Sequence, residues 1–184
     1  AGAYTHLTAG TGLTITDTTI SAQAGGIILG TEQATTSGTS IDFTAIPSGV
    51  KKIVIMLMGV SPNGTSGYLV QLGDAEGIEA TGYLGATGGS DASGVTGTTW
   101  GSGVILVTAA SAANLHSGQV TLALEKSASN AWSASVSMCA EASAVVFVGA
   151  GRKSVSAVLD RVRLTTINGT DTFDAGAINI QYQS

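Results

Sequence analysis

The stretch that most constrains this chain is Val50–Val60, VKKIVIMLMGV, the longest apolar run in the sequence. Its β-branched start and the turn residues on either side of it predict a strand rather than a helix. Its apolar residues alternate between two faces, with Ile53, Ile55 and Leu57 on one and Val54, Met56 and Met58 on the other. A strand of an antiparallel sandwich normally has one face in the core and one in water. This strand therefore needs a second cover, either more of the same chain or another copy of it.

The composition is that of a neutral, hydroxyl-rich protein. Only 10% of the 184 residues are charged, where soluble domains usually carry about 25%, so solubility depends on Ser, Thr, Asn and Gly. This suits an extracellular or virion protein. The net charge of −5 has no basic block, which argues against nucleic acid and anionic membranes as partners. No apolar run is long enough for a transmembrane helix. The single cysteine, Cys139, is expected to be a small buried hydrophobe.

Residues 1–30 differ from the rest, because short apolar pieces alternate there with tight turns. Such pieces bury too little surface to be stable alone, but three copies around an axis could share one core. The phrase TAGTGLTITDTTIS resembles the strand-turn repeats of trimeric viral fibre shafts. The resemblance implies a short trimeric shaft-like segment, with Leu13, Ile15 and Ile20 at the subunit interface. The alternative is a loose N-terminal tail.

Residues 31–184 show a continuous β pattern without a helical window. Short alternating stretches and frequent turn signals predict about nine or ten strands in an all-β, jelly-roll-like antiparallel β-sandwich. The stretch around Tyr68, Val70 and Leu72 is expected to return beside Val50–Val60 as a hairpin. Residues 86–103 are expected to form a long Gly/Ser/Thr loop, and loops of that length are usually functional or disordered.

Two phrases in this region resemble a known class of proteins. TSIDFTAIPSGVKKIVIMLMGVSPNGTSGYLVQLGD and LDRVRLTTINGTDTFDAGAINIQY look like the terminal domain of tailed-bacteriophage tail fibres and related virion structural proteins. The resemblance implies a homotrimeric fibre tip that contacts the host surface. Residues 76–117 carry no part of it, and receptor-facing variation is expected there.

No residue pattern indicates catalysis, and no cofactor is expected. His6 and His116 have neither metal-ligand nor triad spacing, so both are expected to be surface residues. Asp74, Glu76 and Glu79 could be imagined as carboxylates for polysaccharide hydrolysis, which some phage tailspikes perform. The chain offers little room for the long groove that such enzymes need.

No metal site is expected either. Residues 168–174, NGTDTFD, have alternating oxygen ligands but lack the glutamate that closes a calcium loop, so a turn capped by Asx side chains is favoured. Arg161 and Arg163 share one strand face. They are interpreted either as a solvated face or as partners of Asp171 or Asp174 across a subunit boundary. The predicted interface of the tip thus comprises Val54, Met56, Met58, Arg161 and Arg163.

Ligand binding is predicted in the Gly-rich segment. Most aromatic residues fall on core positions, but Tyr83 and Trp100 flank or lie within that segment. Together with Ser90 and Asp91 they are predicted to face a glycan. The alternative is that Trp100 folds back as a lid on the end of the sandwich.

The preferred hypothesis is a non-enzymatic virion fibre protein whose trimeric tip binds a host surface glycan or outer-membrane receptor. Other virion proteins would be contacted through the N-terminus, and no membrane insertion is expected. The main alternative is a purely structural virion protein, such as a head fibre, decoration protein or tail adaptor. A depolymerase and a bacterial adhesin module are more remote alternatives.

Overall fold

The computed structural model of the chain describes residues 13–16, 19–22, 26–91 and 94–184. Antiparallel strands account for most of them, and the only helix in these ranges is a 3-10 turn, Ser127–Ser129. Nothing helical in this part of the chain has the length and apolar character needed to cross a bilayer. The prediction of an all-β sandwich is confirmed.

The N-terminal segment contains a two-stranded sheet of its own. β1 (Leu13–Thr16) and β2 (Thr19–Ala22) run antiparallel, with Ile15 opposite Ile20. Short strands on both sides of residues 17–18 agree with the pattern predicted from the sequence. The shared three-fold core stays a prediction.

The larger sheet of the sandwich has nine strands. Along the path β10-β9-β14-β13-β12-β6-β16-β3 neighbours are hydrogen-bonded, and β4 also pairs with β16. Their bounds are β3 Ile27–Leu29, β4 Gln33–Ala34, β6 Lys52–Pro62, β9 Tyr83–Asp91, β10 Gly94–Thr99, β12 His116–Lys126, β13 Ala131–Ala140, β14 Val145–Ser154 and β16 Phe173–Gln183. The last strand, β16, lies between β6 and β3, inside the sheet. Because β3 already pairs with β16, the sandwich begins before the predicted boundary at residue 31.

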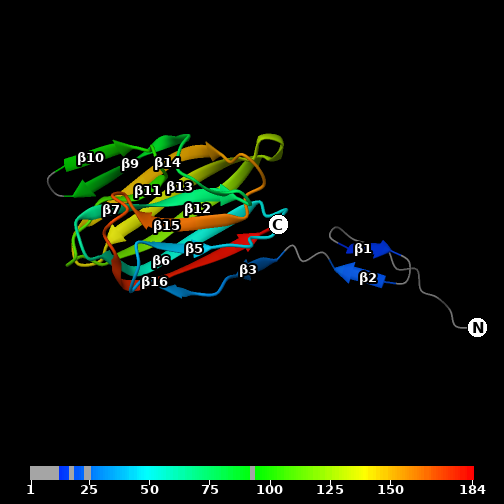
Figure 1. The fold of residues 1–184 in the computed structure, drawn as a ribbon, viewed down its shortest axis with the longest axis horizontal. Coiled ribbons are helices and arrows are strands. Elements are labelled where there is room, and N and C mark those ends of the chain that lie inside the picture. Colours follow the sequence, from blue (N-terminus) through cyan, green and yellow to red (C-terminus); the bar gives the residue numbers. More distant parts are fainter. Residues whose placement is uncertain (1–12, 17–18, 23–25, 92–93) are drawn as a thin grey trace, which may run out of the picture.

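The smaller sheet has five strands and covers the inner face of the larger one. Its order is β11-β7-β15-β5, with β8 on β7. The bounds are β5 Ser40–Phe43, β7 Ser66–Asp74, β8 Gly77–Glu79, β11 Val104–Ala109 and β15 Arg161–Thr166. Figure 1 shows β7, β15 and β5 in front of β12, β6 and β16, and side chains from both sheets form one core. With nine and five strands, the sandwich is broader than an eight-stranded jelly roll.

β6 is the predicted central strand, and its two faces have different environments. Ile53 and Ile55 point into the core and are fully buried. On the opposite face Met56 is half-buried, and Met58 is 72% exposed. The smaller sheet thus covers one face of β6, while Met58 on the other face remains in contact with solvent.

β7 does not return beside β6, so the predicted hairpin is wrong. The two strands belong to different sheets, and the chain crosses between them after Pro62. Asn63 is held by Thr172, whose backbone N–H donates to the Asn63 side chain over 3.0 Å. A Cβ atom on Gly64 would lie 2.1 Å from a carboxylate oxygen of Asp171, so a side chain there would displace the Asp171 carboxylate.

The segment 86–103 is largely a β-hairpin and not a loop. β9 and β10 pair from Asp91 opposite Gly94 to Ala86 opposite Thr99. The indole ring of Trp100 lies on two glycines of neighbouring strands. A Cβ atom would come within 2.4 Å of the ring at Gly85 and within 2.3 Å at Gly151. The glycines therefore mark close packing inside the sheet.

One end of the core holds a cluster of four rings, contributed by Tyr68, His116, Phe147 and Phe173. The ring centroids of His116 lie 5.7 Å from Tyr68 and 5.9 Å from Phe147. His116 is only 1% exposed, so the prediction of a surface histidine is wrong. Burial lowers the pKa of His116, and this outweighs the opposing effects of its hydrogen bond with the Val60 backbone and of the Glu141 charge.

We expect the buried His116 to make the fold sensitive to mild acid. The unfolded chain binds a proton at the ordinary imidazole pKa of about 6.5, whereas the folded chain binds it only at lower pH. The free energy of unfolding should therefore fall as the pH drops below about 6.5 toward the folded-state pKa.

Urea unfolding at a series of pH values between about 7.5 and 5 measures this slope. His116→Gln should remove it. Tyr68→Phe is the control, because it deletes a buried hydroxyl of the same cluster that has no hydrogen-bond partner among the described residues. Equal slopes in the wild type and His116→Gln would contradict the prediction.

Candidate functional site

The two aromatic residues predicted to face a ligand are buried. Tyr83 is 3% exposed, and its hydroxyl donates to the Glu79 carbonyl over 2.8 Å and accepts from the Leu72 N–H over 2.7 Å. Trp100 is 5% exposed, and its indole N–H donates to Thr87 over 2.9 Å. Neither ring is open to a sugar, so the predicted aromatic platform is wrong. Trp100 folds back onto the core, as the alternative interpretation had it.

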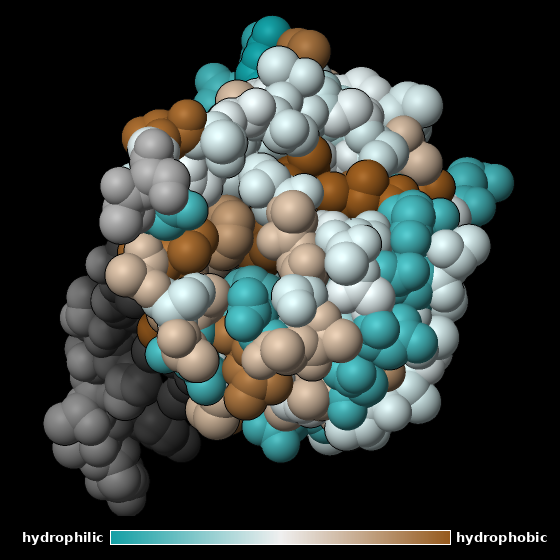
Figure 2. Space-filling view, turned by 90° about the vertical axis from the view of Figure 1, so that its left-hand side faces the viewer, coloured by the Kyte–Doolittle hydropathy of each residue, from teal (hydrophilic) through white to brown (hydrophobic). Residues whose placement is uncertain are grey.

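Ser90 and Asp91 lie in a different environment, at the end of the sandwich where β9 and β10 meet. Both line a hollow of about 310 Å³, here called the hairpin hollow. The side chains and backbone that matter for its chemistry belong to Gly89, Ser90, Asp91, Thr96, Thr108 and Phe147. Figure 2 looks onto this end of the molecule, where brown hydrophobic residues are exposed among pale residues and the teal ones gather on one side.

The hairpin hollow combines hydrogen-bonding groups with an apolar wall. Thr96 and Thr108 supply hydroxyls, and one oxygen of Asp91 accepts from the Gly94 N–H over 3.1 Å. Ser90 contributes backbone only, because its side chain shares the outer face with Val95 and Val146. Ala109 and Val145 form the apolar wall. Phe147 is 5% exposed and lies beneath Gly89, where a Cβ atom would come within 3.1 Å of its ring. The volume of the hollow is at the lower end of the ~300–1,000 Å³ found for ligand sites, which fits about one sugar ring.

Three of the lining residues were missed by sequence reasoning. Thr108 ends a buried strand, and Phe147 lies in a strand that is apolar on both faces, so neither pattern distinguishes them from ordinary core positions. Thr96 falls in the stretch predicted as a loop. The signal that could have located the hollow is Gly88-Gly89, because consecutive glycines in a strand indicate close approach of another group.

Of the three carboxylates considered for hydrolysis, Asp74 and Glu79 bind backbone N–H groups, and Glu76 is exposed. Asp74 is 2% exposed and accepts from the N–H groups of Glu76 and Ala157, each over 2.9 Å. Glu79 forms an ion pair with Lys153 and accepts from the Ser156 N–H over 2.6 Å. Burial raises the pKa of Glu79. The hydrogen bonds from Lys153 and Ser156 lower it by a larger amount, so the pKa lies below its usual value.

The segment 168–174 is a turn capped by Asx side chains, the interpretation favoured over a calcium loop. The Asn168 side-chain oxygen accepts from the N–H groups of Thr170 and Asp171, both over 3.0 Å. Asp171 in turn accepts from the Asn168 amide over 2.8 Å and from the Ser66 N–H over 2.9 Å. Within the described ranges, no group of three or more His, Cys, Asp or Glu side chains is placed to hold a metal ion.

Arg161 and Arg163 have carboxylate partners within their own chain. Arg163 binds Asp42 with two hydrogen bonds of 2.6 and 2.7 Å, and Arg161 binds Asp160 over 2.7 and 3.1 Å. Within the single chain neither partner is Asp171 or Asp174, and the pairing across a subunit boundary stays a prediction. Both guanidinium groups are about one-third exposed or less, on the outer side of β15.

A second candidate surface is the outer face of the nine-stranded sheet. Cross-strand pairing places its central residues in three rows across β14, β13, β12, β6 and β16. The rows are Val148, Ser137, Gln119, Met56 and Asn179; Ala150, Ser135, Thr121, Val54 and Gln181; and Val146, Cys139, Ser117, Met58 and Ala177. We call this set the outer face. None of its members is charged, and Cys139 is half-buried there instead of lying in the core.

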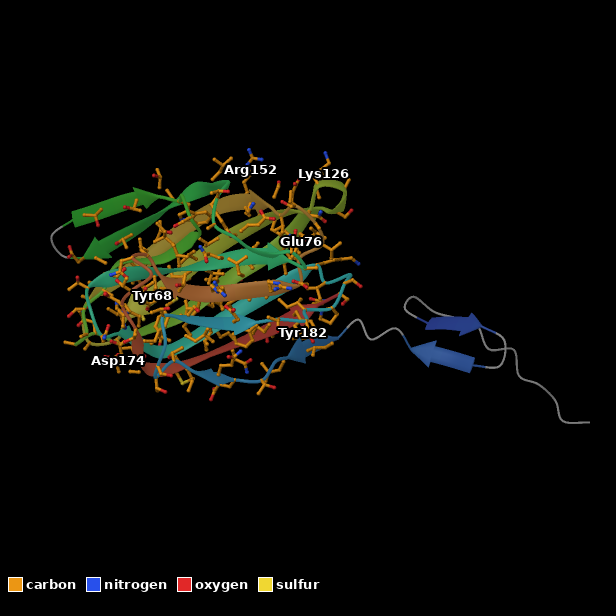
Figure 3. All side chains as sticks on the ribbon, viewed as in Figure 1. Tyr68, Glu76, Lys126, Arg152, Asp174 and Tyr182 are labelled. Atoms are coloured by element: carbon orange, nitrogen blue, oxygen red, sulfur yellow. The ribbon has the colours of Figure 1, made fainter. Side chains whose placement is uncertain are left out.

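Charged side chains lie only beyond the ends of the outer face. Lys52 and Arg152 follow it at one end, where Figure 3 labels Arg152. Glu141 lies at the other end, hydrogen-bonded to the Ser117 hydroxyl. His6, the remaining residue considered for chemistry, lies outside the described residues.

Comparison with protein-family models, with curated proteins and with solved structures found no match to this chain. The function proposed below therefore depends on the hairpin hollow, the outer face and the sequence phrases quoted above.

Proposed function

We propose that the protein is a non-enzymatic bacteriophage fibre protein whose trimeric tip binds a glycan on the host-cell surface. The hairpin hollow is the glycan site. The observation that carries this proposal is the meeting of the Thr96 and Thr108 hydroxyls and the Asp91 carboxylate with an apolar wall of Ala109 and Val145 in a hollow of about 310 Å³.

The chemistry of the hairpin hollow suits a sugar better than an ionic or a wholly apolar ligand. A sugar ring presents hydroxyls to hydrogen-bond and C–H groups to pack on an apolar wall. Threonine hydroxyls both donate and accept, and the Asp91 carboxylate accepts. Of the predicted ligand residues, Asp91 keeps its side chain in this proposal and Ser90 lines the hollow with its backbone, while Thr96 and Thr108 take the place of Tyr83 and Trp100.

The sequence adds two supports. The two phrases that resemble tail-fibre terminal domains now fall on β5, β6, β7, β15 and β16, which are framework strands of the sandwich. The hollow lies on the hairpin within residues 76–117, where receptor-facing variation was expected. The carboxylates of Asp74 and Glu79 accept hydrogen bonds from backbone N–H groups, and Glu79 also pairs with Lys153. These structural roles favour a binding function of the protein over hydrolysis.

A glycan array of bacterial surface polysaccharides tests the proposal. The wild type should bind at least one member, and Thr96→Val with Thr108→Val should weaken that binding about tenfold or more, because each lost hydroxyl leaves a sugar group unpaired. Thr99→Val is the matched control on the same strand, outside the hollow. Equal binding by the double variant and the control would reject the hairpin hollow as the site.

A purely structural virion protein is the second candidate, and the uncharged outer face favours it. Such a face suits permanent packing within a particle. In that case the wild type would bind no glycan on the array, and electron microscopy would find the sandwich enclosed by other virion proteins instead of at a free tip.

A further inference from the structure

We infer that the outer face is where copies of this chain pack on one another, each outer face against the same face of its neighbours. This inference deepens the proposed function by naming the surface through which the copies bind one another. It rests on the proposed function only for the number of copies, which is three.

The first reason is the concentration of exposed apolar side chains on one side of the molecule. Met58 is 72% exposed, Val148 64% and Val146 50%. At the margins, Leu29 on β3 continues the row of Val54, and Val95 on β10 continues the row of Val146. Both are also more than 60% exposed. Contiguous apolar surface of this kind marks interaction sites.

The second reason is electrostatic and points to a copy of the same chain. About a quarter or more of surface positions are usually charged, yet the outer face has no charged member. The chain has a net charge of −5, so most surfaces of two copies would bring carboxylates together. Two outer faces can approach each other without that repulsion.

The third reason is the type of polar group. The polar members of the outer face, Cys139 apart, are hydroxyls and amides, namely Ser117, Ser135, Ser137, Thr121, Gln119, Gln181 and Asn179. Each such group both donates and accepts hydrogen bonds. Identical faces can therefore satisfy one another in several registers, which a face of carboxylates or ammonium groups could not do.

The fourth reason is area. The five strands of the outer face at about 4.8 Å spacing and its three rows at about 6.8 Å give about 24 by 20 Å, or about 490 Å². The neighbouring strands β3, β9 and β10 extend this side of the sheet to at most about 750 Å², against the ~800 Å² per partner of a stable interface. The central residues are already well packed, since Val54 is only 7% exposed within the single chain. The face therefore needs little rearrangement to pack.

The chain provides its own probe for this interface. Cys139 is the only cysteine, and it lies on the outer face between Val146 and Ser117. In the wild type, light scattering should give a mass of three 18.2 kDa chains, and a maleimide should label Cys139 slowly. Dilution below the dissociation concentration should speed labelling tenfold or more.

Ser135→Lys places a cation within each outer face, in the row of Val54. Since like charges across an interface are strongly unfavourable, the dissociation constant should rise about 100-fold and labelling should become fast. Ser40→Lys makes the same change on an exposed strand position of the other sheet and should leave both readouts unchanged. Circular dichroism establishes that each variant is folded, and the dilution series on the wild type does not depend on any variant.

Two outcomes would overturn the inference. These are a single-chain mass for the wild type, whether or not Cys139 is protected, and an oligomer in which Cys139 reacts as fast as in Ser135→Lys. A two-chain mass with Cys139 protected would support the interface and reject the trimer of the proposed function. Glycan binding on the array is scored separately, so failure of the interface and failure of the binding site remain distinguishable.

Discussion

Trp100→Ala should lower the free energy of unfolding by about 3–5 kcal/mol, the range found when a buried tryptophan is truncated. The ring is 5% exposed and lies on Gly85 and Gly151. Neither glycine has a side chain that could move into the space, so a cavity remains. The change also removes the donor to Thr87, whose own hydroxyl donates to the Ile105 carbonyl over 2.5 Å. Urea unfolding of both proteins at neutral pH measures the difference.

Leu84→Ala is the control for this change. Leu84 lies on β9 next to Gly85 but is 57% exposed, so its truncation should cost less than about 1 kcal/mol. If Trp100 had the surface role first predicted, Trp100→Ala would weaken ligand binding and leave the free energy of unfolding unchanged. A loss below 1 kcal/mol for Trp100→Ala would show that the ring is not part of the core.

Glu79→Gln should destabilise the fold by about 3 kcal/mol, because it leaves a buried ammonium group without its counter-charge. The Lys153 side chain is 6% exposed. Without Glu79 it would keep only the Ser154 carbonyl at 2.7 Å and the Tyr83 ring, whose centroid lies 5.5 Å away. The comparison uses urea unfolding at pH 7, where Glu79 is ionised in the wild type because its pKa is lowered.

Lys153→Met tests the same pair from the other side and should cost less than half as much. Glu79 is 20% exposed, so its carboxylate can be partly hydrated, and it keeps the Ser156 N–H at 2.6 Å. The more exposed pair of Arg161 and Asp160 provides the reference, since Arg161→Met should have the smallest effect of the three changes. A larger loss for Lys153→Met than for Glu79→Gln would contradict the assignment of Lys153 as the buried partner.

Strand positions were predictable where one face of a strand is core and the other is water. The serine ladder of β13 alternates with buried Trp132, Ala134, Val136 and Met138, as its sequence predicts. The separation of β6 and β7 into different sheets was not predictable in this way. Both strands are apolar on two faces, so alternation does not show which sheet each one joins, and a short turn suits a crossing between sheets as well as a hairpin.

The candidate site was predicted in location but not in detail. A glycine-rich stretch has the same composition whether it forms a loop or a strand that carries an indole ring. Only the contacts of Gly85 and Gly151 with Trp100 distinguish the two. His116 was misassigned for a similar reason, because its neighbours along the chain are polar, while the rings that bury it come from β7, β14 and β16.

The place of β16 inside the larger sheet has a consequence for biosynthesis. β16 leaves the ribosome after the other strands of the sandwich, and β3, the first of them, has it as a partner. During translation one edge of β6 is therefore unpaired until β16 arrives, and unpaired edges invite association with other chains. Completion of this sheet must follow synthesis of β16, so a nascent chain stalled before residue 173 should be prone to aggregate.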